Sequence, residues 1–309
     1  GIVSAVLLFV SVLVHELAHS YVARKNGLPI ARITLFFFGG VSEIREEPKN
    51  PRLEVRMAAA GPLTSFAIAA VFAGLASAGR DVLDLGLAPS PKVVFATKCL
   101  GAGGGMIITA SHNPPDWNGL KFIGPDGLPL TEAELLTLRR DWSEGVFKPA
   151  NWHSVGRILP GRLSGRYEKA IIDCVDAQAL RKARLNVVVD PGNGAGSLVT
   201  PFVLRQLGCN LTAINASPDG TFPRPIEPTK EALSGLAEAV KASSADVGFA
   251  HDCDADRLVC VSETGEVLPE DMTLAIVLDS FLRANPGSVF VTNVASSSVF
   301  DDIAGKYHS

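Results

Sequence analysis

Short β-rich runs alternate with helical stretches along most of this chain, from about residue 74 to the last residue. Gly, Pro and Asp, which are typical turn residues, bound the β-rich runs. This order predicts α/β layers in which helices cover both faces of a sheet. The predicted strands are 93–96, 106–109, 187–189, 211–214, 247–250, 258–261 and 289–291, with a further strand at 81–86, and the predicted helices include 132–140, 167–175 and 230–242.

The first 80 residues differ in composition from the rest. Apolar runs cover residues 1–14 and 57–79, and the second reaches the roughly 20 residues of a membrane-spanning helix. The chain starts with Gly1, so the first run is compatible with a helix that has been cut. A signal peptide is the less favoured alternative, because neither a basic start nor a small-residue cleavage site is present. The sequence therefore predicts an α-helical, membrane-type segment ahead of the α/β part.

An H-E-x-x-H pattern follows the first apolar run, formed by His15, Glu16 and His19. Residues four apart share a helix face, so both histidines can bind one Zn²⁺ while Glu16 acts as the general base of peptide hydrolysis. A chance pair of histidines is the alternative. Ionisable residues inside an apolar helix are costly and usually functional, which favours the zinc site.

Together with the Phe36-Phe37-Phe38-Gly39-Gly40 run and Ala60-Gly61-Pro62, this motif resembles the site-2 protease family of intramembrane zinc metallopeptidases over about residues 1–72. The resemblance implies a third zinc ligand, an aspartate in a later membrane helix. No such segment follows here. Because two imidazoles leave a weak, open site, we expect no protease activity from this segment alone.

Composition limits the partners of the α/β part. The formal net charge of −4 argues against a nucleic-acid binder and favours a small-molecule partner. Five cysteines, without a C-x-x-C pair, argue against a disulfide framework or a zinc knuckle. These features indicate a cytoplasmic location for this part.

One loop presents a serine at the end of a predicted strand, in the run Gly105-Met106-Ile107-Ile108-Thr109-Ala110-Ser111-His112-Asn113-Pro114. A serine exposed on such a loop is placed to accept a phosphoryl group. A Ser-His-Asp hydrolase is the alternative. It is disfavoured because Ser111 lacks a G-x-S-x-G nucleophile elbow.

A second loop carries carboxylates at alternate positions, Asp252, Asp254 and Asp256, followed by Arg257. Hard oxygen ligands in this arrangement suit Mg²⁺, and Arg257 can bind a phosphate bidentately. An acidic surface turn is one alternative. An EF-hand is the other, and it fits only in part, because Arg257 stands where that loop needs glycine. A third loop, Asp190-Pro191-Gly192-Asn193-Gly194-Ala195-Gly196-Ser197, lacks the ending of a P-loop and is interpreted as a structural turn.

In this order the three loops resemble the α-D-phosphohexomutase superfamily, the phosphoglucomutases and phosphomannomutases, over about residues 74–309. The resemblance implies mixed-sheet, three-layer domains and an interconversion of hexose 1-phosphate and hexose 6-phosphate. It implies that Ser111 is the phosphoserine, that the three aspartates bind Mg²⁺ together with the serine phosphate, and that Arg257 contacts the phosphoryl group. Lys121 becomes the general acid/base, assisted by His112, and a hexose 1,6-bisphosphate is the intermediate and activator. Lys121 would then need a pKa lowered by nearby cations.

The sequence departs from that family in two ways. Cys253 stands where the family usually has glycine, which predicts altered loop geometry and metal affinity. The family's opening strand and helix, its sugar-reading loop and its fourth domain are not found, so we expect low mutase turnover.

The predicted domains are a site-2-protease-like membrane fragment at 1–73, a first mutase domain at 74–160, a second at 161–265 and the start of a third at 266–309. In this interpretation the mutase domains are truncated at both ends and work on hexose phosphates. An intramembrane zinc protease carrying a foreign tail is the alternative function.

Overall fold

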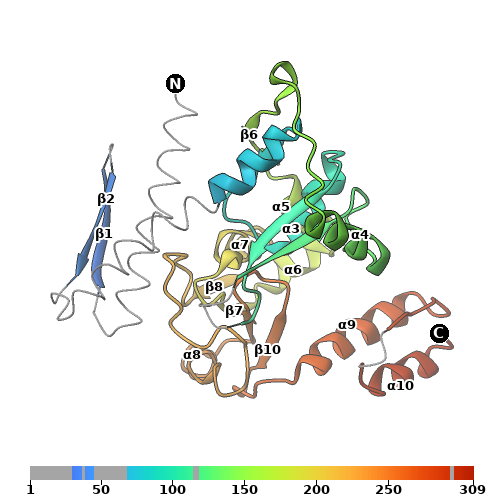
Figure 1. Ribbon diagram of the computed structural model, residues 1–309. Coiled ribbons are helices and arrows are strands. Elements are labelled where there is room, and N and C mark those ends of the chain that lie inside the picture. Colours follow the sequence, from blue (N-terminus) through green and yellow to red (C-terminus); the bar gives the residue numbers. More distant parts are fainter. Residues whose placement is uncertain (1–29, 37–38, 45–67, 114–117, 293–295) are drawn as a thin grey trace.

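A four-stranded sheet lies at the centre of the computed structural model, which describes residues 30–36, 39–44, 68–113, 118–292 and 296–309 (Figure 1). Its strand order is β10-β9-β7-β8. β7 (Asn186–Asp190) is parallel to its two neighbours, β8 (Asn210–Ala213) and β9 (Val247–His251). β10 (Leu258–Ser262) pairs antiparallel with β9. The sheet is therefore mixed, as predicted.

Helices pack on this sheet because its central strand is apolar on both faces. Val187, Val188 and Val189 of β7 are all buried, which is typical of a strand covered on both sides. Val188 packs in one core cluster with Leu236 and Val240 of α8 (Ser234–Ala242). A second cluster joins α7 to the helices before it. The bounds of these helices are α5 Arg166–Asp173, α6 Ala177–Ala183 and α7 Thr200–Gln206.

Two smaller strand pairs precede this sheet in the chain. β3 (Val82–Asp84) is parallel to β6 (Ile158–Pro160). β4 (Gly105–Thr109) is antiparallel to β5 (Gly119–Ile123), and α3 (Ser90–Cys99) packs against β4. The β4–β5 pair matters for function, because one strand leads to Ser111 and the other carries Lys121.

Further helices are α4, α9 and α10, and a local sequence motif explains where α4 begins. Thr131 and Glu134 form a reciprocal capping box at the start of α4 (Glu132–Ser143). Near the end of the chain, α9 (Glu270–Ala284) and α10 (Val299–Lys306) pack through a cluster that includes Leu282 and Phe300. Short 3₁₀ helices lie at η1, Trp152–Ser154, and η2, Ala195–Leu198.

Most predicted strands and helices are present, and two predicted strands are wrong. Residues 93–96 lie within α3. Their β propensity is overridden because the helix starts directly after Pro89 and places Pro91 in its first turn, where proline is tolerated. Residues 289–291 form no strand, because none of the described residues pairs with them. Val289 and Val291 are accordingly 90% and 83% exposed.

The predicted helical segment at 1–73 is described only in part. Residues 30–36 and 39–44 form an antiparallel pair of strands, β1 (Ile30–Phe36) and β2 (Gly39–Ile44), which the prediction of an α-helical segment did not include. Isoleucine and threonine in the first strand favour this conformation. Residues 68–77 are helical, as expected. Nothing in the described part of the chain is a helix both long and apolar enough to cross a membrane.

The core of the central sheet provides a first prediction. Leu236→Ala should lower the free energy of unfolding by about 2–5 kcal/mol, because Leu236 is only 1% exposed and its removal leaves a cavity against β7. Urea unfolding followed by circular dichroism measures this loss. Leu136→Ala on α4 is the matched control, since Leu136 is 57% exposed and its loss should cost under about 1 kcal/mol. Equal losses in both variants would contradict the assigned core.

Candidate active site

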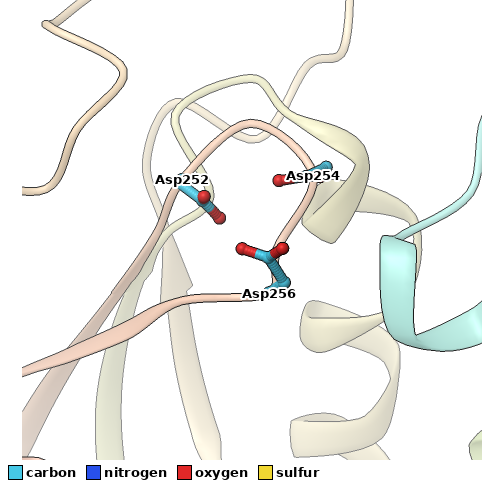
Figure 2. Close-up of side chains that lie close together, drawn as sticks. All are labelled: Asp252, Asp254 and Asp256. Atoms are coloured by element: carbon cyan, nitrogen blue, oxygen red, sulfur yellow. The ribbon is translucent and has the colours of Figure 1, made fainter. Parts of the chain in front are cut away.

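The turn between β9 and β10 brings together the side chains of Asp252, Asp254 and Asp256, and we call residues 252–257 the metal loop. His251 and Leu258 form the last pair of the antiparallel ladder, so the loop projects from the end of the sheet. One oxygen from each of the three carboxylates lies within 4.8 Å of the others. Figure 2 shows the three side chains directed toward one another from a single turn. The predicted ligands are therefore grouped in space as a metal site requires.

The charge on this loop is only partly compensated. Asp252 is 1% exposed, and burial together with the charges of Asp254 and Asp256 raises its pKa to about 7. Among the described residues, Oδ2 of Asp252 and Oδ1 of Asp254 are buried side-chain oxygens without a hydrogen-bond partner. Buried acceptors of this kind are costly unless a donor or a cation satisfies them. The residues present therefore fit a bound divalent cation.

Ser111 is presented by the turn that follows β4. Its φ of 55° is in the left-handed region, and its backbone N–H donates to Oγ1 of Thr109 at 2.8 Å. Lys121 on the neighbouring strand is paired with Ile107. The Lys121 Nζ lies 3.4 Å from the Ser111 Oγ. Strand pairing therefore places an amine beside the hydroxyl that the sequence singled out.

Lys121 joins the serine loop to the metal loop. Its Nζ donates to Asp254 Oδ2 at 3.0 Å and to Asp256 Oδ2 at 2.8 Å. Cys253 adds another link, because its thiol donates to the backbone carbonyl of Ser111 at 2.7 Å. Two loops separated by more than a hundred residues thus share one set of contacts.

The pKa of Lys121 differs from expectation. Burial opposes its charge, but hydrogen bonds to Asp256 and Asp254 outweigh burial, and the pKa of Lys121 is raised. The expectation of a pKa lowered by nearby cations is therefore wrong for this arrangement, in which carboxylates are the neighbours. Lys121 is held protonated, as a general acid requires.

His112 and Arg257 form a second set of contacts near the serine. The Nδ1 of His112 is 3.5 Å from Ser111 Oγ and accepts a hydrogen bond from Arg257 Nη2 at 3.1 Å. Arg257 also forms ion pairs with Glu227 at 3.3 Å and Glu270 at 3.6 Å. These carboxylates hold the guanidinium near the serine, within reach of an incoming phosphate.

Two residues that hold Asp254 were missed by sequence reasoning. The Oγ of Ser90 donates to Asp254 Oδ2 at 2.7 Å, and the Oγ1 of Thr109 donates to the same oxygen at 3.1 Å. Burial, the largest single influence, raises the pKa of Asp254. The hydrogen bonds from Ser90, Lys121 and Thr109 and the charge of Lys121 together outweigh it, so the pKa of Asp254 is lowered. The only sequence signal for Ser90 was its place between Pro89 and Pro91. The two residues lie 164 and 145 positions from Asp254 in the sequence, so only folding brings them into contact with it.

The glycine loop, residues 190–197, was interpreted from sequence as a structural turn, and it contacts the metal loop. The backbone N–H of Ala195 donates to the carbonyl of Cys253 at 2.8 Å. A Cβ at Gly194 would overlap that carbonyl oxygen. Gly194 is therefore required for the close approach of the two loops.

Cys253 has no left-handed φ; the residue of the metal loop in the left-handed region is Ala255, with a φ of 53°. The expected changes in loop geometry and metal affinity at Cys253 stay predictions. Burial raises the pKa of the Cys253 thiol to about 12, so it stays protonated and acts as a donor.

The proposed zinc residues His15, Glu16 and His19 lie outside the described residues. The structure therefore brings together the candidates from residues 111–257 and leaves the H-E-x-x-H motif as a prediction.

Comparison with protein families gives two matches. Residues 63–146 match "Phosphoglucomutase/phosphomannomutase, alpha/beta/alpha domain I", and residues 165–265 match domain II of the same family. Neither match covers residues 1–62.

Among curated proteins, a phosphoglucomutase/phosphomannomutase of Thermococcus kodakarensis is 46% identical over 239 residues, which are 77% of this chain and 52% of that protein. A probable phosphoglucosamine mutase of Pyrococcus abyssi is 41% identical over 75% of this chain and 51% of its own length. The chain thus spans about half the length of these relatives.

Solved structures agree on the fold. A putative phosphomannomutase from Thermus thermophilus aligns with a TM-score of 0.65 and 27% identity, covering 77% of this chain and 55% of that one. A phosphoglucomutase/phosphomannomutase family protein from Burkholderia thailandensis has the same TM-score at 24% identity and covers 96% of this chain and 60% of its own, which supports the fold. Residues 63–146 and 165–265 therefore belong to the phosphoglucomutase/phosphomannomutase family, as its domains I and II.

Proposed function

We propose that this chain carries the phosphoryl-transfer centre of a Mg²⁺-dependent phosphohexomutase, with Ser111 as the residue that carries the phosphoryl group. The observation that supports this most strongly is the meeting of the serine loop and the metal loop at Lys121. A serine hydroxyl, an amine and a cluster of carboxylates are what phosphoryl transfer uses, because its catalysis depends on positioning and charge stabilisation.

Asp252, Asp254 and Asp256 are the residues that would hold Mg²⁺. Their hard oxygen atoms, including the two without hydrogen-bond partners, suit this ion better than Zn²⁺, which favours nitrogen and sulfur ligands. When bound, the ion would supply positive charge that stabilises the transferring phosphoryl group.

Lys121 accounts for the proton movements at Ser111. In the first transfer a sugar hydroxyl attacks phosphorus, the new bond to the sugar oxygen forms as the bond between phosphorus and Oγ breaks, and the hydroxyl proton passes to water. Oγ takes a proton, which Lys121 is placed to donate from 3.4 Å. In the return transfer Oγ attacks a phosphoryl group of the sugar bisphosphate and its proton goes back to Lys121. The bond between phosphorus and the sugar oxygen breaks, and that oxygen takes a proton from water. His112 lies 3.5 Å from the Ser111 Oγ and can orient the serine, and Arg257, which donates to His112, can neutralise phosphate charge.

We propose that the substrates are hexose phosphates, interconverted between the 1-phosphate and the 6-phosphate through a bisphosphate. This follows the names of the relatives, which include phosphoglucomutase/phosphomannomutase and probable phosphoglucosamine mutase. The three domain boundaries predicted from sequence, near residues 73, 160 and 265, remain part of this proposal.

Phosphorylation of Ser111 tests the proposal directly. The protein incubated with glucose 1,6-bisphosphate and Mg²⁺ should gain the mass of one phosphoryl group. Oγ attacks one phosphorus of the bisphosphate, the bond from that phosphorus to the sugar oxygen breaks, and a glucose monophosphate leaves. Intact-mass spectrometry measures the gain. Ser111→Ala should abolish it and Ser143→Ala, a serine exposed on α4, should keep it. Labelling that persists in Ser111→Ala would assign the phosphoryl group to another residue.

Metal removal provides a second test. Treatment with EDTA should reduce phosphorylation to background, and added Mg²⁺ should restore it, because the carboxylate oxygens then regain their cation. The same mass measurement reports both steps. Full labelling of the EDTA-treated protein would disprove a metal requirement.

Lys121→Met should slow phosphorylation of Ser111 by about 10²–10⁴-fold, because the general acid/base is lost. Quenched time courses at saturating Mg²⁺ measure the rate. Lys98→Met, at an exposed lysine of α3, is the control and should react as the wild type does. Mn²⁺ binding to Lys121→Met should not weaken, since the variant removes a cation from the carboxylates. Weaker Mn²⁺ binding together with the slower rate would point to a disrupted loop instead of a lost acid/base.

A further inference from the structure

Arg224 is a buried arginine whose contacts neither the sequence motifs nor the proposed reaction uses. Its side chain is only 8% exposed. The guanidinium donates from Nε to Asp190 Oδ2 at 3.0 Å, and from Nη2 to the backbone carbonyls of Asp190 at 3.2 Å and His251 at 2.7 Å. Its Nη1 donates to the carbonyls of Pro225 and Ile226 at 3.0 and 3.4 Å. Each of the three guanidinium nitrogens, Nε, Nη1 and Nη2, thus donates to at least one acceptor.

These contacts join the ends of two neighbouring strands. Asp190 ends β7 and His251 ends β9, and the two strands are parallel, with Asp190 paired to Ala250. The Asp190 carboxylate is itself fixed, because Gly192 N donates to it at 2.8 Å and Asn215 Nδ2 at 3.0 Å. Arg224 therefore sits on a rigid anchor and holds the carbonyl of the residue directly before Asp252.

His251 extends this arrangement to the far end of the metal loop. Its Nδ1 lies 2.9 Å from the carbonyl oxygen of Arg257, and since a carbonyl only accepts, Nδ1 carries the proton. Its Nε2 is then free to accept from the Thr200 hydroxyl at 3.0 Å. His251 thus precedes the loop directly in sequence, is held by Arg224 through its carbonyl, and contacts the last residue of the loop, Arg257, through its ring.

We propose that Arg224 is a positioning residue for the metal loop. By holding the His251 carbonyl against the anchored Asp190, it fixes the direction in which the chain leaves β9 and therefore where the Asp252 carboxylate lies. A planar guanidinium can bridge a carboxylate and a carbonyl at once. This inference rests on the proposed metal site, and it concerns a residue that lies behind that site.

Binding of Mn²⁺ alone to the metal-free full chain tests the proposal, without any requirement for catalysis. Arg224→Met should weaken Mn²⁺ binding by about tenfold, which is the usual effect of losing a group that orients metal ligands. Electron paramagnetic resonance of free Mn²⁺ gives the dissociation constant. Arg205→Met, at an exposed arginine of α7, should bind as the wild type does.

A second variant separates positioning from general stability, because Arg224→Met leaves the buried Asp190 carboxylate without its counter-charge. Combining Asp190→Asn with Arg224→Met removes both charges and should recover part of the melting temperature. Mn²⁺ binding should remain about tenfold weak, because the His251 carbonyl still lacks its donor.

Recovery of Mn²⁺ affinity in the double variant, or wild-type affinity in Arg224→Met, would overturn the proposal. Failure of the wild-type chain to bind Mn²⁺ would instead overturn the proposed metal site and this inference with it. The two failures are therefore distinguishable in the same titration.

Discussion

The balance of charge between three clustered carboxylates and the groups around them determines the rest of this site. Like charges at such short distances repel, and burial of Asp252 and Asp254 removes the water that would screen them. Lys121 offsets part of the charge, and Ser90 and Thr109 direct their hydroxyl groups to Asp254. Because these groups come from domain I and the aspartates from domain II, charge compensation also brings the serine to the metal loop.

The scaffold behind the loop makes such an unfavourable cluster possible. An arrangement with unsatisfied buried oxygens costs free energy, so the surrounding structure must hold it in place. Gly194 allows one backbone to approach the Cys253 carbonyl, and Arg224 ties the strand end to Asp190. These contacts therefore hold the carboxylate oxygens in an arrangement that is unfavourable without a cation but suited to binding one.

Sequence alone predicted the parts of this molecule that depend on local pattern. The strands that end at Thr109 and His251 follow from short apolar runs bounded by turn residues, and the aspartates follow from their alternate spacing. The strand predicted at 93–96 failed because two flanking prolines favour a helix start over β propensity. Ser90, Thr109 and Arg224 were missed because their partners lie far away in the chain. The pKa direction of Lys121 was wrong for the same reason, since it depends on which charges folding places beside the amine.

Cys253 illustrates how the two loops depend on each other. A thiol in the middle of a metal loop would be expected to disturb it, yet its Sγ faces the Ser111 carbonyl and the left-handed turn lies at Ala255. Cys253 therefore connects the metal loop to the backbone of Ser111, the residue that is proposed to carry the phosphoryl group. Lys121 and Thr109 also connect the two loops, through hydrogen bonds to the metal-loop carboxylates. Any rotation of one domain against the other therefore changes the positions of the serine, the amine and the carboxylates together. The proposed phosphoryl transfer is thus expected to be sensitive to the contact between domains as much as to any single residue.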